Sequence, residues 1–231
     1  MKASGSSKIA KKNNYIDCGK YLLRTVTIDD ASDRWASWMT DPEANYMLNA
    51  PARNLKKSDL IDYINRFDQS SRLLLGVFER QMDFPLVAPH ACRVLALRAE
   101  AGEPAVLATT AHIGILTMDI DHATGQFLVN YLIGEPEYRN KGVTNDITVP
   151  FRDYFFETLG LKKIMATALA RNQVIIHYLL KTGWKLEKTL QRHVKSHSDG
   201  TMLDLCFFSQ SQDDWRAWKK ENLADRPQSN C

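Results

Sequence analysis

The feature that most restricts the fold is an apolar run, a basic turn and an amphipathic stretch that follow one another in mid-chain. FLVNYLI (127–133) is typical of a buried strand, and VTNDITVPFRDYFFETLG (143–160) has the apolar spacing of a helix. Between them, GEPEYRNKGVT (134–144) places Arg139 and Lys141 beside Gly142. A strand that turns into a helix leaves the first helical N–H groups unpaired, and the helix dipole adds positive charge there. The sequence therefore predicts a phosphate or diphosphate site at this helix start.

Two familiar phosphate-binding loops do not match this turn. Lys141 precedes the glycine, whereas the Walker A loop places its lysine directly after a glycine. Gly134 and Gly142 are too far apart for the dinucleotide pattern G-x-G-x-x-G. What remains is R-x-x-G-x-T, which taken alone fits either a phosphate-binding turn, for a nucleotide among other ligands, or a solvated turn with two surface cations.

The remaining pattern predicts a mixed α/β fold with both hairpins and crossovers. In the helices, Ser58 is expected as the N-cap of one, and Asn172 as the N-cap and Gly183 as the stop of another. Pro150 lies inside the 143–160 helix and should bend it. Strands are expected at 21–27, 72–79, 112–120, 126–133, 162–169, 184–194 and 201–209, and helices at 31–39, 41–48, 56–67, 143–160, 172–183 and 213–222.

The domain organisation is expected to be simple. Residues 1–14 are interpreted as a flexible basic tail, 15–220 as one domain and 221–231 as a C-terminal tail. Within the domain, 80–111 is interpreted as an insertion because prolines and Gly102 interrupt its pattern, although CRVLALRAE (92–100) could form a strand.

Composition excludes several classes of function. A net charge of +3 is too small to argue for nucleic acid, and no apolar run approaches the ~20 residues that a membrane span needs. The lysines at the start of the chain precede no apolar segment, so they do not form a secretory signal. The four cysteines show no C-x-x-C pattern, which favours free thiols and a cytoplasmic protein. We expect a monomer or a homodimer.

The central turn resembles the signature of the GNAT superfamily of acyl-CoA-dependent N-acetyltransferases. That signature, [QR]-x-x-G-x-[GA], opens the family's central helix, and here it is RNKGVT (139–144). Thr144 departs from the small final residue, and its side chain either crowds the phosphate or binds it. NQVIIHYLLKTGW (172–184) is similar to the family's N-x-x-(apolar)…K-x-G-F segment.

Other segments resemble the branch that acetylates ribosomal-protein N-termini, the Rim-type enzymes. These are DPEANYML (41–48), LQRHVKSHSDGTMLDLCFFS (190–209) and DDW (213–215). The resemblance covers about residues 20–80 and 112–218 in the right order. It implies the GNAT fold, a splayed central β-sheet flanked by helices, with acetyl-CoA as co-substrate and no metal.

The resemblance also implies which residues hold coenzyme A. The pantetheine arm would pair with a strand edge, and the diphosphate would rest on amides at the helix start. The implied cofactor-binding residues are Tyr131, Leu132, Ile133, Arg139, Asn140, Lys141, Gly142, Val143, Thr144 and Asn172.

The usual acid and base of the family are missing from the matching positions. Many relatives carry a Glu where this chain has Leu128, and a Tyr where it has Leu179. We consider three substitutes: Asp119 late in a strand, Tyr178 one residue from the usual position, and His193, because histidines titrate near neutrality. His193 and His197 lie on a strand and its turn without a further ligand, so they do not predict a metal site. For binding of the amine acceptor the candidates are Trp38, Tyr46 and Asn130, although Trp38 also belongs to an apolar helical stripe.

The expected activity is transfer of an acetyl group from acetyl-CoA to a primary amine. The acceptor could be a protein N-terminus, an amino sugar or another small amine. The alternative is a non-catalytic acyl-CoA sensor or degenerate family member, which the missing Glu and Tyr favour.

Overall fold

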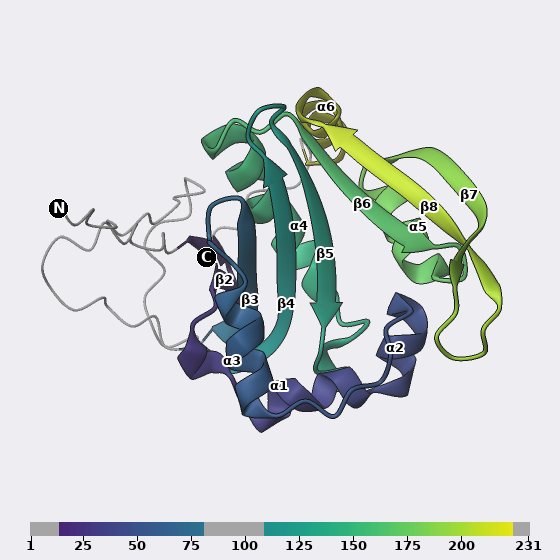
Figure 1. The fold of residues 1–231 in the computed structure, drawn as a ribbon. Coiled ribbons are helices and arrows are strands. Elements are labelled where there is room, and N and C mark those ends of the chain that lie inside the picture. The colour runs from purple at the N-terminus through teal and green to yellow at the C-terminus, as the bar shows by residue number, and fades with distance from the viewer. Residues whose placement is uncertain (1–13, 81–108, 224–231) are drawn as a thin grey trace, which may run out of the picture.

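One mixed β-sheet organises the part of the chain that the structure, a computed structural model, describes, namely residues 14–80 and 109–223 (Figure 1). Its eight strands lie in the order β1-β2-β3-β4-β5-β6-β8-β7. Neighbouring strands pair antiparallel except β5 and β6, which are parallel. The strands are β1 (Tyr15–Cys18), β2 (Tyr21–Thr25), β3 (Arg72–Arg80), β4 (Thr109–Asp121), β5 (Gln126–Ile133), β6 (Lys163–Leu169), β7 (Lys185–Lys195) and β8 (Met202–Ser211).

Helices cover both faces of this sheet (Figure 1). Helices α1 and α3 lie in front of the sheet in Figure 1, and α4 lies behind it. The α-helices are α1 (Asp33–Ser37), α2 (Pro42–Leu48), α3 (Lys57–Asn65), α4 (Val143–Asp153), α5 (Gln173–Lys181) and α6 (Gln212–Leu223). Mixed strand pairing with helices on both faces confirms the predicted α/β class.

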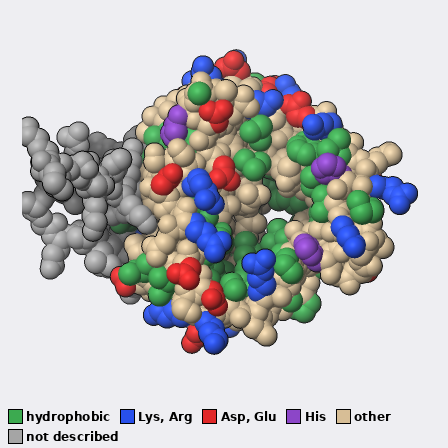
Figure 2. Space-filling model, viewed as in Figure 1, with side chains coloured by type: hydrophobic (Ala, Val, Ile, Leu, Met, Phe, Trp, Pro, Cys, Tyr) green, Lys and Arg blue, Asp and Glu red, His purple; other side chains and the backbone are tan. Residues whose placement is uncertain are grey.

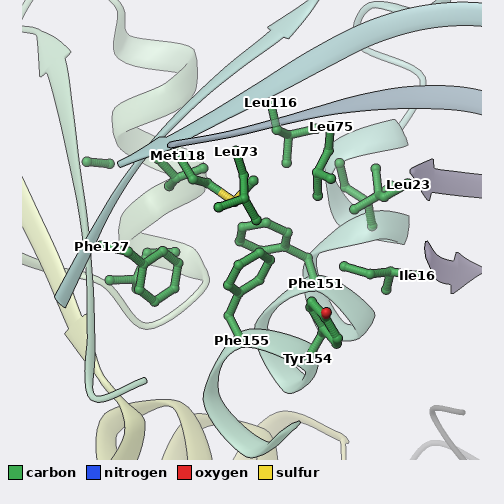
Figure 3. Packing of buried hydrophobic residues seen from close by; sticks show 14 of the residues in the cluster. Ile16, Leu23, Leu73, Leu75, Leu116, Met118, Phe127, Phe151, Tyr154 and Phe155 are labelled. Carbon is green, nitrogen blue, oxygen red and sulfur yellow. The ribbon is translucent and has the colours of Figure 1, made fainter. Parts of the chain in front are cut away.

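The main core lies between the sheet and α4. Phe155, just after α4, stacks on Phe127 of β5 with ring centroids 5.2 Å apart, and its ring lies 4.7 Å from that of Phe151 on α4. Leu75 and Leu116 from the central strands point into the same layer (Figure 3). Burial of these large apolar side chains fixes the position of α4, and therefore of the turn that precedes it.

The sheet opens between β5 and β6. These strands pair only from Gln126 to Leu128 against Lys163 to Met165, after which they diverge (Figure 1). The opposite edge of β5 stays paired with β4 as far as Ile133, opposite Gly114. Val129–Ile133 therefore present one edge that no β6 strand occupies, as the splayed sheet implied by the resemblance requires.

The central helix follows the prediction with one local change. Helix α4 passes through Pro150 and continues as a single π-helical turn, Tyr154–Thr158. The Leu159 N–H accordingly donates to the Tyr154 carbonyl at 3.0 Å. Helical structure ends just before Gly160, near the predicted stop.

Several local predictions differ from the structure. Strand β1 is not among the predicted strands. Asn14, expected as the last residue of a flexible tail, is 4% exposed and accepts a hydrogen bond from the Tyr154 hydroxyl. Ser58 was predicted as an N-cap, but this is wrong: α3 begins at Lys57, and the Asp59 carboxylate accepts the Lys56 N–H at 2.8 Å. The reason is that Asp59 supplies the capping oxygen from inside the first turn.

Other predictions are tested only in part. Strand β3 runs to Arg80 and β4 begins at Thr109, so most of the predicted insertion 80–111 lies outside the described residues, as do most of the expected tails. Cys206 is a free thiol, whereas Cys92 and Cys231 fall outside the described ranges. Within residues 14–80 and 109–223, no helix is long and apolar enough to cross a membrane.

His112 on β4 predicts a pH-dependent stability. Its ring stacks on Phe78 at 4.5 Å and meets Trp35 and Trp38 edge-on at 5.1 Å each. Burial among these rings lowers the pKa of His112 to about 4, against partial support from nearby Asp30. In the unfolded chain His112 takes up a proton near pH 6.5, whereas in the folded protein it does so only near pH 4. The contribution of neutral His112 to the free energy of unfolding is therefore complete above pH 6.5 and is lost as the pH falls towards 4.

Between pH 7 and pH 4.5 we expect the free energy of unfolding to fall by about 2 to 3 kcal/mol less in His112→Phe than in wild type. Urea unfolding at both pH values measures it, with exposed His177→Phe as the matched control. An identical pH dependence in His112→Phe and wild type would contradict this account of the ring.

Candidate active site

The turn before α4 leaves helical N–H groups available. Asn140 and Gly142 both adopt left-handed backbone angles, with φ of 59° and 83°. Gly142 is the N-cap and offers no side chain to the helix, and the first helical bond is from the Asp146 N–H to the Gly142 carbonyl. In the described part of the chain, the N–H groups of Val143, Thr144 and Asn145 have no hydrogen-bond acceptor. This is the geometry that the sequence predicted for a phosphate site.

The Arg139 side chain turns inward from this turn. Its Nε donates to the Ile133 carbonyl at 3.0 Å and its Nη2 to the Gly134 carbonyl at 2.8 Å. Its Nη1 donates to Asp41 at 2.6 Å. Arg139 thus joins the end of β5 to the start of α2, whereas Lys141 on the same turn is exposed.

Asp41 has two partners at once. Its carboxylate caps α2 by accepting the N–H groups of Glu43 at 2.9 Å and Ala44 at 3.0 Å, and it also pairs with Arg139. Burial disfavours this charge, but the Ala44 N–H and the Arg139 guanidinium outweigh burial and lower the pKa of Asp41. The carboxylate therefore stays ionised at neutral pH and fixes α2 against the turn.

Two cavities meet where β5 and β6 diverge. The outer cavity, of about 430 Å³, runs along the end of β5, the turn and the starts of α4 and α5. The inner cavity, of about 410 Å³, lies between β5, β6, α4, α5 and the end of α2. In Figure 2, viewed as in Figure 1, the molecule is open right through in this region. Both cavities are lined by Met47, Leu48, Tyr131, Asn172, Ile175 and Tyr178.

Most residues predicted to hold the cofactor surround the outer cavity. Asn172 also caps α5 as predicted, accepting the Ile175 N–H at 3.3 Å. Lys141 belongs to the turn but does not line the cavity. The predicted residues that line it are Tyr131, Leu132, Ile133, Arg139, Asn140, Gly142, Val143, Thr144 and Asn172.

Tyr178 stands at the junction of the two cavities. Its hydroxyl is hydrogen-bonded to Thr148 Oγ1 and also donates to the Thr144 carbonyl at 3.3 Å. Burial raises the pKa of Tyr178, although nearby Arg152 acts in the opposite direction. The phenol is therefore a protonated donor at neutral pH, placed beside the unpaired part of β5.

The other two catalytic candidates lie away from both cavities. Asp119 pairs with Leu128 across the strands, forms an ion pair with Arg72 at 3.4 Å and is exposed. His193 is exposed on β7. Neither residue lines the outer or the inner cavity. Among the described residues, no three His, Cys, Asp or Glu side chains come together in a way that could hold a metal ion.

The three acceptor candidates lie in different places. Asn130 lines the inner cavity, and its Nδ2 donates to Thr117 Oγ1 at 3.4 Å. Trp38 is 3% exposed and lines neither cavity, and its Nε1 donates to Glu135 at 2.8 Å. Tyr46 lies outside both cavities under the Arg171 guanidinium, at 3.9 Å, although the next residues of α2, Met47 and Leu48, line both.

Sequence reasoning missed a polar row on α4. Thr148 and Arg152 follow Thr144 at intervals of four residues, so all three lie on one side of the helix. Thr148 contacts Tyr178, and Arg152 lines the inner cavity. The four-residue spacing of Thr144, Thr148 and Arg152 was the signal that could have identified them.

Comparison with known proteins identifies the family. Residues 20–185 match the acetyltransferase (GNAT) domain. The chain therefore belongs to the GNAT acetyltransferase family. No curated protein sequence matches the chain.

Solved structures of acetyltransferases share the fold. Spermidine N-acetyltransferase from Vibrio cholerae, in complex with CoA and spermine, superposes with a TM-score of 0.65 at 15% identity, covering 85% of this chain and 98% of that one. A GNAT-family acetyltransferase from Bacillus anthracis gives 0.62 at 13% identity, with 86% and 99% covered. The microcin C7 self-immunity acetyltransferase MccE, with acetyl-CoA and AMP, gives 0.61 at 15% identity, with 84% and 93% covered. None of these matches places the chain in the Rim-type branch, which stays a prediction.

Substitution of Gly142 tests the turn. We expect Gly142→Asp to weaken CoA binding roughly 10²-fold, about 2.7 kcal/mol, because an N-cap carboxylate takes up the helical N–H groups and repels phosphate. A Cβ at Gly142 meets no atom within 4 Å, so the change causes no clash, although the φ of 83° strains any side chain placed there. Calorimetric titration with CoA gives the affinity.

Two controls separate charge from backbone strain. Gly142→Ala introduces a side chain at the same φ without charge, and Gly19→Asp introduces the same residue at a φ of 75° in similarly open space. Both should bind CoA within about threefold of wild type. Wild-type affinity in Gly142→Asp would remove the turn from the cofactor site.

Proposed function

We propose that this protein transfers an acetyl group from acetyl-CoA to a primary amine. One observation supports the proposal: the unpaired edge of β5 and the uncapped N–H groups of α4 both face the outer cavity. A diphosphate would satisfy the N–H groups, and the amides of a pantetheine arm would pair with Tyr131–Ile133. The acceptor amine then enters the inner cavity from the side of α2. A protein N-terminus, an amino sugar or another small amine would each supply it.

The proposed reaction forms a C–N bond and breaks the C–S bond of the thioester. The amine nitrogen attacks the thioester carbonyl, and backbone N–H groups of β5 stabilise the charge that develops on its oxygen. The Tyr178 hydroxyl gives its proton to the departing CoA sulfur and regains one from solvent. Its position at the junction of both cavities and its protonated state support this role.

The amine must lose a proton, and the inner cavity supports water as the acceptor. Asp119 and His193 do not line it, whereas Asn130 does and can orient a water molecule. Positioning of two reactants can supply ~7–11 kcal/mol of the barrier. General acid–base help is worth ~10²–10⁴-fold. A site that positions its substrates well therefore works without a side-chain base.

A specific observation also favours a binding protein as the second candidate. The positions at which many relatives carry a Glu and a Tyr hold Leu128 and Leu179. An acyl-CoA sensor would keep the outer cavity and need neither group.

Tyr178→Phe tests the enzyme. We expect kcat to fall about 10²-fold, because sulfur then leaves without its proton donor, while the affinity for CoA changes little. Thiol release from acetyl-CoA with a panel of amines measures the rate. Tyr46→Phe, which removes a hydroxyl from outside both cavities, is the control.

Three results decide between the candidates. Amine-dependent thiol release that Tyr178→Phe lowers supports the enzyme and its acid. Release that Tyr178→Phe leaves unchanged removes Tyr178 from the chemistry. Tight CoA binding with no release for any amine supports the sensor instead.

A further inference from the structure

Arg152 is a buried cation that has no anionic partner among residues 14–80 and 109–223. Its side chain belongs to a residue that is only 1% exposed. Nη1 donates to the Thr182 carbonyl at 2.7 Å and to Gln210 Oε1 at 2.9 Å, and Nη2 donates to Thr182 Oγ1 at 3.0 Å. Nε has no hydrogen-bond partner. Across the described residues, no carboxylate forms an ion pair with Arg152.

The contacts of Arg152 hold its guanidinium in place but include no negative charge. The neutral acceptors and the rings of Trp184 and Trp215, 5.2 and 5.0 Å from the guanidinium carbon, join α4 to β8 and to the turn after α5. They do not neutralise a guanidinium, which stays protonated in proteins. A buried charge is costly unless an opposite charge or a hydrogen-bond set compensates it. Burial accordingly lowers the pKa of Arg152.

The position of Arg152 indicates where an anion would come from. The residue lines the inner cavity together with Tyr131 and Tyr178, one helical turn beyond Thr148. No Asp or Glu is among the described residues that line this cavity. The described lining therefore offers a polycationic acceptor no carboxylate. A substrate carboxylate that extends into the inner cavity could pair with Arg152.

We propose that the inner cavity binds a substrate carboxylate through Arg152. The inference rests on the proposed acyl transfer and names the substrate class for it. The carboxylate has two sources of the same chemistry: the far end of a dicarboxylic acyl-CoA, or an amine acceptor that is an amino acid. The apolar walls formed by Leu169, Leu205 and Val194 suit the carbon chain of either.

The first measurement compares acyl groups of equal shape. Calorimetry of the wild-type protein with succinyl-CoA and with 4-methylpentanoyl-CoA, in which an isopropyl group replaces the carboxylate, gives the preference of the donor site. The second measurement titrates CoA-saturated protein with leucine and with leucinamide. In one of the two pairs we expect the ligand with the carboxylate to bind at least tenfold more tightly. A preference in the first pair identifies the acyl group as the source of the carboxylate, and one in the second pair identifies the amine acceptor.

Arg152→Met then tests the assigned residue. We expect the preference to fall to about onefold in the variant, while its affinity for CoA itself stays within about threefold. Arg216→Met on α6, which removes an exposed arginine paired with Glu157, is the matched control and should keep the preference. A merely structural Arg152 would change stability and leave the ratio of affinities unaltered.

The outcomes separate this inference from the function on which it rests. Failure of the wild-type protein to bind CoA overturns the proposed function, and this inference with it. CoA binding with no carboxylate preference in either pair overturns this inference alone, and so does a preference that persists in folded Arg152→Met. If Arg152→Met does not fold, the two wild-type ratios decide.

Discussion

The end of hydrogen bonding between β5 and β6 is the constraint on which the site depends. After Leu128 and Met165 the two strands separate, and each leaves an unpaired backbone edge. Buried backbone groups need partners, so an opening of this kind persists only where side chains fill part of it and a ligand or water satisfies the rest. Tyr131 of β5 lines it, and so do Ile175 and Tyr178 of α5. The same divergence creates the edge, joins the two cavities and brings α4 to their border.

Charge is distributed unevenly over this opening. At the turn, backbone N–H groups are available to a ligand, whereas the Arg139 side chain is committed to Asp41 and two carbonyls. At the inner cavity a side chain carries the positive charge instead, namely the guanidinium of Arg152. A basic motif in a sequence therefore does not tell which of its parts contacts a ligand, since here the arginine organises the turn and the glycine exposes the amides.

The sequence predicted best what depends on neighbouring residues. The strand, turn and helix around Gly142 and the cap at Asn172 follow from local backbone chemistry, and the structure has both. The four-residue strand β1 was missed because YIDC mixes an apolar run with a charge and is too short for a clear period. Whether a residue such as Asp119, His193 or Arg152 lines a cavity depends on how distant elements are brought together. A single sequence does not encode that visibly, so the first two were singled out for their chemistry and the third was overlooked.

The bond between Arg139 and Asp41 has a consequence for how this protein can change. Asp41 caps the start of α2, and this helix lines both cavities through Met47 and Leu48. Asp41 also binds the Arg139 side chain of the turn where the cofactor would rest. A mutation that remodels α2 is therefore expected to disturb the turn before α4 as well. Adaptation to a different substrate is expected to proceed through β6, because Ala166–Leu169 line the inner cavity but not the outer one.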